Sequence, residues 1–407
     1  MWLTLLALIS AAAVASFAEL FPLHHFPLPI AALMWSATSL LFLLALFLNI
    51  SLLSPLARLE QAFAPNLMTL MLKKKAISFY RLSLMIGAFV AYLFSLAFLV
   101  NEPYRLWFFL SWWVIFGMMI DLFRKNWSAL AHLLSPFHLV KEVEVSAKEA
   151  VRDSQDHDLW AALDTLCEMA LSATKRQKIA LATQIVQTFS PILGAFYRSS
   201  KSISRLSQDE QVAKETGQDE ISYTLFYFLQ RLELIYDQAL AAQLQSLCRQ
   251  IVMTLGRIIL QGAKLDLSLL PFPMRILVQF ALQAQQRYLQ QITELANSTI
   301  VEIAKTVVQE ADLAHAELLP PFMSMIKGLE NIAKGHFKQN KFADIDTLTQ
   351  PLTDLKKLLK HPNIAQHADL PFIEKEMERA LAEFEALKQV MAAMPTIQEQ
   401  AETEPLK

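Results

Sequence analysis

The sequence predicts an all-α protein, with an N-terminal four-helix transmembrane domain followed by a cytoplasmic helical domain of long antiparallel helices. Three observations lead to this fold class. Of the 407 residues, 54% are hydrophobic and only 18% are charged, whereas soluble proteins average about 25% charged residues. Glycine occurs only 8 times, too rarely for the turns of β-hairpins and nucleotide-binding loops. The charges are also distributed unevenly along the chain.

This uneven charge divides the chain into two parts. Residues 1–140 contain 8 basic and 4 acidic side chains, whereas the other 267 residues contain 28 basic and 34 acidic ones. Six of the seven tryptophans lie at or before Trp127. We therefore predict a transmembrane domain over residues 1–126, a cytoplasmic α-helical domain over residues 127–394 and a disordered tail over residues 395–407.

Four apolar runs predict the membrane spans. A helix needs about 20 residues to cross a hydrocarbon core of about 30 Å. The runs cover about residues 2–21, 29–51, 80–101 and 105–123. The first run also resembles a cleaved signal peptide, but it lacks the basic segment of such signals, so we expect it to be retained. The fourth run contains Asp121, which we expect to snorkel or to pair with Arg124.

The basic residues of the first part predict its orientation and a contact with lipid. Lys73, Lys74 and Lys75 lie between the second and third runs. By the positive-inside rule, this loop and both termini are cytoplasmic, as in a multi-pass protein of a bacterial inner (plasma) membrane. Leucines at helical spacing precede the lysines, as in an interfacial helix whose lysines meet anionic lipid. The alternative is that the lysines only set the topology.

The second part predicts long helices. Apolar residues recur at helical spacing over 221–259 without a proline, and a second long helix is expected over 273–316, either continuous or interrupted at residues 297–299. The polar segment 198–217 is predicted to be a loop. We expect polar residues and proline, rather than the scarce glycine, at the helix ends. Pro-Phe pairs recur at residues 271, 321 and 371, which indicates either a repeated helical hairpin or a coincidence.

The last helix carries an a/d pattern of three heptads. The apolar positions alternate in steps of four and three: Ile373, Met377, Ala380, Phe384, Leu387, Met391 and Met394. This seam predicts either a coiled coil with another subunit or partner, or a helix packed on its own domain.

The sequence contains no catalytic or nucleotide-binding motif. We therefore expect no catalytic residue, no cofactor and no metal site, and the weak acidity argues against a nucleic-acid partner. Cys167 and Cys248 are isolated on apolar helix faces and are expected to be buried thiols. Glu19, His24 and His25 form a polar group at the outer membrane face, either as a site for metal or protons or as a solvated rim.

The favoured hypothesis is a membrane-anchored helical interaction or scaffolding protein without enzymatic activity. Its expected partners are membrane lipids and a second copy or another protein, bound through the C-terminal helix. The alternative is an oligomeric membrane channel, with membrane tension as one candidate stimulus for its opening. A third hypothesis is a lipid-modifying enzyme that uses Glu19, His24 and His25.

Overall fold

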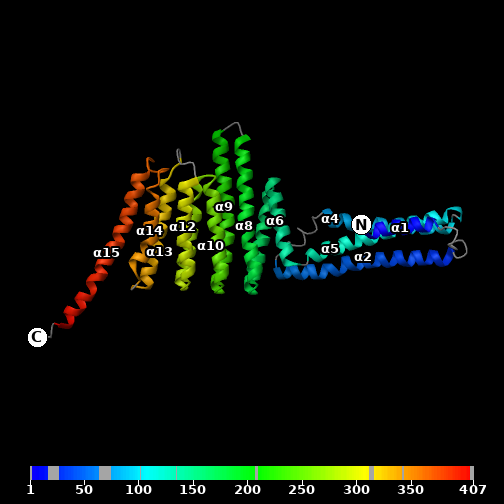
Figure 1. Cartoon of the computed structure of the whole chain (residues 1–407), viewed down its shortest axis with the longest axis horizontal. Helices are drawn as coiled ribbons and strands as arrows, with labels where there is room; N and C mark the ends of the chain where they lie inside the picture. Colours follow the sequence, from blue (N-terminus) through cyan, green and yellow to red (C-terminus); the bar gives the residue numbers. More distant parts are fainter. Residues whose placement is uncertain are drawn as a thin grey trace. The chain divides into compact units, whose positions relative to one another are not determined.

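The computed structural model describes residues 2–16, 27–63, 75–100, 102–133, 135–206, 210–310, 316–341 and 343–403. Over these residues the chain is helical and contains no β-strand, as the composition predicts (Figure 1). The chain divides into two compact units, Met1–Val143 and Glu144–Lys407.

The described residues of the first unit form four long helices. They are α1 (Trp2–Ser16), α2 (Pro27–Phe63), α4 (Lys75–Val100) and α5 (Arg105–Leu133). Each begins within the corresponding predicted span or a few residues before it. Helix α2 is longer than predicted, because it continues through Pro55 into the basic loop. Its 37 residues extend about 55 Å at about 1.5 Å per residue.

Within the described residues, four helices are long and apolar enough to cross a membrane. Two of them, Leu82–Val100 and Arg105–Ser128, are predicted spans in the first unit. The other two, Ile179–Ser199 and Leu267–Gln286, belong to the second unit, where no span was predicted. In the first pair 28% of the residues are buried, against 56% and 61% in the second pair. Packing within the protein therefore accounts for much of the apolar character of the second pair, whereas the first pair leaves its apolar side chains exposed.

The exposed side chains of the first unit indicate a membrane protein. Leu33, Phe47, Phe89 and Trp107 are each more than 60% exposed, and many other large apolar residues on the same helices are also uncovered. Soluble monomers rarely expose so large an apolar surface. Lipid is the solvent that suits such a surface, because it requires no burial of apolar groups.

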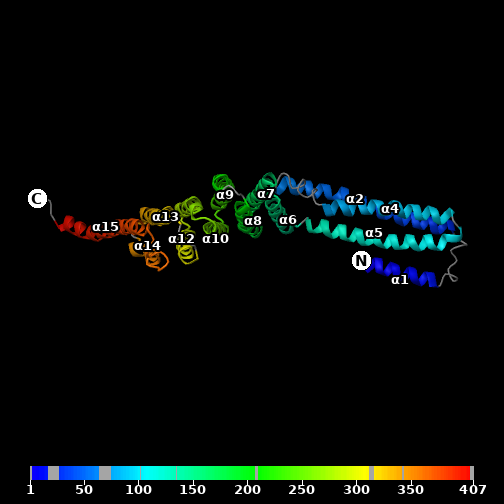
Figure 2. The same cartoon turned by 90° about the horizontal axis from the view of Figure 1, so that it is seen from above.

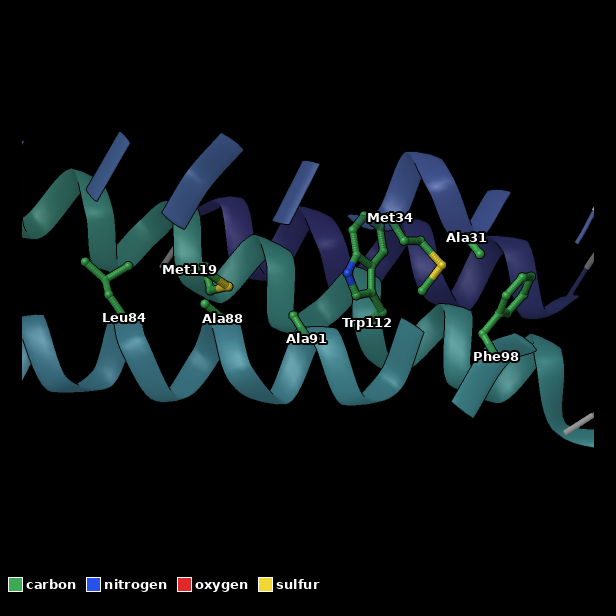
Figure 3. Packing of buried hydrophobic residues seen from close by; sticks show 8 residues of the cluster. All are labelled: Ala31, Met34, Leu84, Ala88, Ala91, Phe98, Trp112 and Met119. Carbon is green, nitrogen blue, oxygen red and sulfur yellow. The ribbon is translucent and has the colours of Figure 1, made fainter. Parts of the chain in front are cut away.

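The inner faces of α2, α4 and α5 form a small core (Figure 3). Ala88 and Ala91 are fully or almost fully buried on α4, and their small side chains allow the facing helices to approach closely. Trp112 of α5 is 1% exposed and stacks on Phe116 with 5.0 Å between the ring centroids. The first unit is therefore packed as a helix bundle.

The second unit is a two-layered array of helices. Its elements are α6 (Pro136–Arg152, shared with the first unit), α7 (Asp156–Lys175), α8 (Ile179–Leu206), α9 (Glu210–Ala241), α10 (Gln245–Ala263), α11 (Pro271–Gln286), α12 (Gln290–Glu310), α13 (Leu319–Gln339), α14 (Ile345–Leu358) and α15 (Leu370–Thr403). From α7 onward, each helix packs against the next helix and the next but one. The odd-numbered helices form one layer and the even-numbered helices the other (Figure 2). This arrangement is that of a helical solenoid.

Four tight turns join successive helices with one common geometry. Ser154, Gln177, Gln243 and Tyr288 each have φ between 53° and 60°. In every case the next backbone N–H donates to the carbonyl of an alanine five residues earlier: Ala150, Ala173, Ala239 or Ala284. This is the Schellman arrangement, which usually places glycine at the left-handed position. No described glycine has a positive φ, so three polar residues and a tyrosine close these helices, much as the glycine count predicts.

Two of these turns divide the predicted long helices. The helix predicted over 221–259 is two helices, since α9 ends at Ala241 and α10 begins at Gln245. The helix predicted over 273–316 is likewise divided, after Gln286. The helices on the two sides of each break both bury apolar faces. The apolar spacing in the sequence therefore continues across the break, and the sequence does not reveal it.

Two predicted non-helical segments also differ in the structure. Within the predicted loop 198–217, α8 continues to Leu206 and α9 begins at Glu210. The predicted tail begins at residue 395, but α15 continues through Thr403.

The Pro-Phe pairs mark a structural repeat. They lie in the first turns of α11, α13 and α15, which are successive helices of one layer. The hydroxyl of Ser324 donates to the carbonyl of Pro271, joining the starts of α13 and α11. Asp369 accepts the backbone N–H groups of Leu318 and Leu319 and so joins the starts of α15 and α13. Of the two explanations, the structure favours the repeat, with the three starts along one edge of the array.

Candidate functional site

Several predicted site residues lie outside the described part of the chain. Glu19, His24, His25, Lys73 and Lys74 are among them. Lys75 is the first residue of α4. Among the residues that the structure describes, no three His, Cys, Asp or Glu side chains are grouped so that they could hold a metal ion.

The polar groups of the first unit join its helices. Asp121 of α5 is 7% exposed and accepts hydrogen bonds from the backbone N–H and the hydroxyl of Thr4 on α1, at 2.9 and 2.5 Å. This contact with α1 was not predicted, because the sequence suggested that Asp121 snorkels or pairs with the neighbouring Arg124. The indole N–H of Trp113 donates to Ser10 of α1, and that of Trp112 donates to Thr38 of α2. Such bonds between helices stabilise membrane bundles.

The first four residues of the C-terminal seam pack against other helices of the same chain. Ile373, Met377, Ala380 and Phe384 are at most 1% exposed, and α15 packs against α13 and α14. The next seam residues, Leu387 and Met391, are half-buried, and the side chain of Met394 lies outside the described part. For the first four residues, the structure therefore favours packing on the chain's own domain over a contact with a partner.

Ion pairs fasten α15 to α13. Glu330 of α13 has a side chain only 6% exposed, and it pairs with Lys334 at 2.7 Å and with Arg379 of α15 at 2.9 Å. Glu383 of α15 pairs with Lys334 at 2.6 Å. Hydrogen bonding to Lys334 lowers the pKa of Glu383, and hydrogen bonding to Glu330 raises the pKa of Lys334. The charged residues that flank the seam are therefore paired with residues of the same chain.

Both cysteines are unreactive core residues. Cys167 and Cys248 are buried, as their positions on apolar faces predict. Burial raises the pKa of each thiol to about 12. Because the thiolate is the nucleophilic form, neither side chain is suited to catalysis at neutral pH.

Aromatic residues gather on the surface of the odd-numbered helices, which we call the odd-helix surface. Trp160 of α7 stacks on Tyr227 of α9, and the guanidinium of Arg231 lies 3.7 Å above the ring of Tyr227. Asp164 accepts hydrogen bonds from Arg231 and from the Tyr227 hydroxyl. Tyr223, 53% exposed, also contacts Trp160. The hydrogen bond to Asp164 holds the ring of Tyr227, against which Trp160 stacks.

The aromatic residues continue from α9 to α11. Phe226 of α9 is 46% exposed and stacks on Phe272 of α11 with 5.8 Å between the centroids. The guanidinium of Arg275 lies 5.7 Å from the centre of the Phe272 ring. Phe272 belongs to the first Pro-Phe pair, so the structural repeat places an aromatic ring at this point of the surface.

Beyond Arg275, the surface is hollowed between α11 and α13. This α11–α13 groove has a volume of about 670 Å³, within the range of known ligand sites. Six of the residues that line it are Arg275, Val278, Leu282, Gln283, Lys327 and Asn331. The groove thus combines an apolar strip with amides and two basic groups.

This groove was not predicted from the sequence. Arg275, Gln279, Gln283 and Gln286 recur on one face of α11, and such a polar face resembles an ordinary solvated surface. The only available signal was the Pro-Phe repeat, which aligns the starts of α11 and α13. No signal in either helix alone indicates that the space between them is open.

In comparisons with known proteins, no family model matches the chain. No curated protein matches it, and no solved structure does.

Proposed function

We propose that this chain is a membrane-anchored scaffold that binds protein partners through its odd-helix surface. The observation that carries the proposal is a series of aromatic and basic residues, half-buried at Trp160 and Phe272 and exposed at Tyr223, Phe226 and Arg275, that leads to the α11–α13 groove. Tryptophan, tyrosine and arginine supply most of the binding energy at protein interfaces. Helical solenoids present extended surfaces of this kind to their partners.

Rigidity supports the same function. The bonds of Asp164 to Arg231 and to the Tyr227 hydroxyl hold the Tyr227 ring of α9, on which Trp160 of α7 stacks, before any partner arrives. Hydrogen bonding to Asp164 together with burial raises the pKa of Tyr227 to about 12, and burial is the larger cause. The phenol therefore remains a neutral hydrogen-bond donor at physiological pH. Such a preorganised surface binds with a smaller loss of side-chain entropy.

The proposal places the first unit in a bacterial inner membrane with four spans, both termini in the cytoplasm and Lys73–Lys75 against anionic lipid. Its support is the distribution of basic residues and the exposed apolar side chains of α1, α2, α4 and α5. We expect a green fluorescent protein fused at the C-terminus to fluoresce and an alkaline phosphatase fused there to be inactive. An active phosphatase fusion would overturn this topology.

Photocrosslinking in membranes tests the interaction surface. With benzoylphenylalanine at Tyr223, we expect discrete adducts with one or a few proteins. Benzoylphenylalanine at Met253, exposed on the even-numbered helix α10, is the matched control and should give none. Adducts at both positions alike, or at neither, would contradict a specific surface on the odd-numbered helices.

The same experiment tests association between copies of the chain. Val390, 56% exposed, lies beside the half-buried seam residues Leu387 and Met391 on α15. Leu387 and Met391 continue the a/d pattern beyond the four seam residues that are buried in the domain. The proposal assigns this end of α15 to a second copy or another partner. A crosslinker at Val390 is expected to give a band of about twice the chain's mass, and a monomer band alone would contradict self-association.

A further inference from the structure

The α11–α13 groove is basic. Arg275 and Lys327 are exposed on its two helices, and neither forms an ion pair with a residue that the structure describes. Among the residues that the structure describes, no carboxylate lines the groove. Two acids on neighbouring helices already accept hydrogen bonds: Glu233 from Gln279 and Glu376 from Arg379. In a chain with a net charge of −2, this groove presents two exposed positive charges, and the charge of Lys327 also lowers the pKa of the nearby Glu376 carboxyl, after the larger effect of Arg379.

An amide oxygen in the groove has no hydrogen-bond partner among the described residues. Gln283 lines the groove, and the buried Oε1 atom of this side chain accepts no hydrogen bond within the described structure. A buried acceptor of this kind requires a donor, since an unmade hydrogen bond costs about 1–3 kcal/mol. Gln286 and Asn331 also line the groove. An amide both donates and accepts, which matches the alternating N–H and C=O groups of a peptide backbone.

The floor and length of the groove suit a short extended chain. Val278 and Leu282 contribute apolar surface, and at Gly328 the facing helices approach so closely that an added Cβ would lie 2.6 Å from Val278 Cγ2. Lining residues on α11 range from Pro271 to Gln286, a distance of about 22 Å at about 1.5 Å per residue. An extended peptide of about seven residues covers that distance.

From these observations we infer that the α11–α13 groove binds an extended acidic segment of a protein partner. Carboxylates of the segment pair with Arg275 and Lys327, its backbone bonds to the amides, and an apolar side chain covers Val278 and Leu282. The inference rests on the proposed scaffold function and adds the chemical class of the partner segment.

Binding of a model peptide to the full chain in mild detergent tests the inference. The probe is a fluorescein-labelled octapeptide of alternating glutamate and leucine, measured by fluorescence anisotropy against micelles without protein. The matched peptide has lysine in place of glutamate. We expect the acidic peptide to bind at least tenfold more tightly than the basic one, and its binding to weaken as salt screens the charges.

Charge reversal in the groove provides the second comparison. The double variant Arg275→Glu/Lys327→Glu should raise the Kd of the acidic peptide at least tenfold, and Arg275→Gln/Lys327→Gln should raise it less. The matched control is Arg249→Glu/Arg257→Glu, which makes the same charge change on exposed positions of the even-numbered helix α10. It should alter the Kd less than twofold. Circular dichroism at 222 nm verifies that each variant is folded.

Three results would overturn the inference: equal binding of the two peptides, no effect of the groove variants, or complete competition by free glutamate at the peptide's own concentration. The last result would indicate a small-molecule site. The proposed function is tested separately, because crosslinking at Tyr223 does not depend on the groove charges. If the acidic peptide does not bind but specific adducts still form at Tyr223, the inference of an acidic partner segment is wrong and the scaffold function is retained. If both fail, the scaffold function falls as well.

Discussion

Replacing Tyr236 by alanine is expected to lower the free energy of unfolding of the second unit by about 3–5 kcal/mol, because a buried aromatic ring is removed from a packed core. Tyr236 of α9 is fully buried, and its ring stacks on Phe280 of α11 with 4.0 Å between the centroids. Its hydroxyl donates to the Phe280 carbonyl at 2.7 Å. One side chain thus joins two successive helices of the odd-numbered layer. Urea unfolding of the full chain in mild detergent, followed by circular dichroism at 222 nm, measures the loss.

The matched control is Tyr236→Phe, which keeps the ring and removes only the hydroxyl. A single hydrogen bond contributes about 0.5–1.5 kcal/mol, so this variant should lose much less stability than Tyr236→Ala. Similar small losses in both variants would show that the stacked pair contributes little. Similar large losses would assign the stability to the hydrogen bond instead of the ring.

The second large effect is expected at Gly328, where α13 meets α11. A Cβ at this position would lie 2.6 Å from Val278 Cγ2. Gly328→Ala is therefore expected to destabilise the second unit by about 1–3 kcal/mol through overpacking, although alanine favours an isolated helix by about 1 kcal/mol. The same urea unfolding experiment measures the change.

A double-mutant cycle identifies the cause of this effect. Val278→Ala removes the atom that the new methyl group would meet, so the double variant should be more stable than the sum of the single effects predicts, by about 0.5–3 kcal/mol. Additive losses would show that the two positions do not contact each other.

The C-terminal helix shows which properties follow from its apolar spacing and which depend on the surface that covers its apolar face. The a/d spacing predicted a buried face, and Ile373, Met377 and Phe384 are indeed buried. The spacing did not identify what covers that face, because an apolar stripe packs equally well on its own domain or on another chain. The ion pairs of Glu330 with Arg379 and Lys334 belong to α13 and α15 together, and the two helices are separated in the sequence by α14.

The candidate site was less predictable than the fold. The exposed aromatic residues of α9 and the polar face of α11 are visible in the sequence, but nothing in it places Phe226 against Phe272 or leaves a groove beside Lys327. The residues singled out by composition, Glu19, His24 and His25, lie outside the described part of the chain. Their role remains the prediction made from the sequence.

By itself, the sequence determined the helical fold class, the apolar exposed first unit and most of the buried helix faces, because these properties depend on composition and on a period of 3.6 residues. Only the tertiary structure decided where the long helices break, since the backbone at Gln243 and Tyr288 turns without glycine or proline. It also decided that Asp121 meets Thr4 and that a basic groove opens between α11 and α13. Such contacts join residues distant in the chain, and their packing is a property of several helices together.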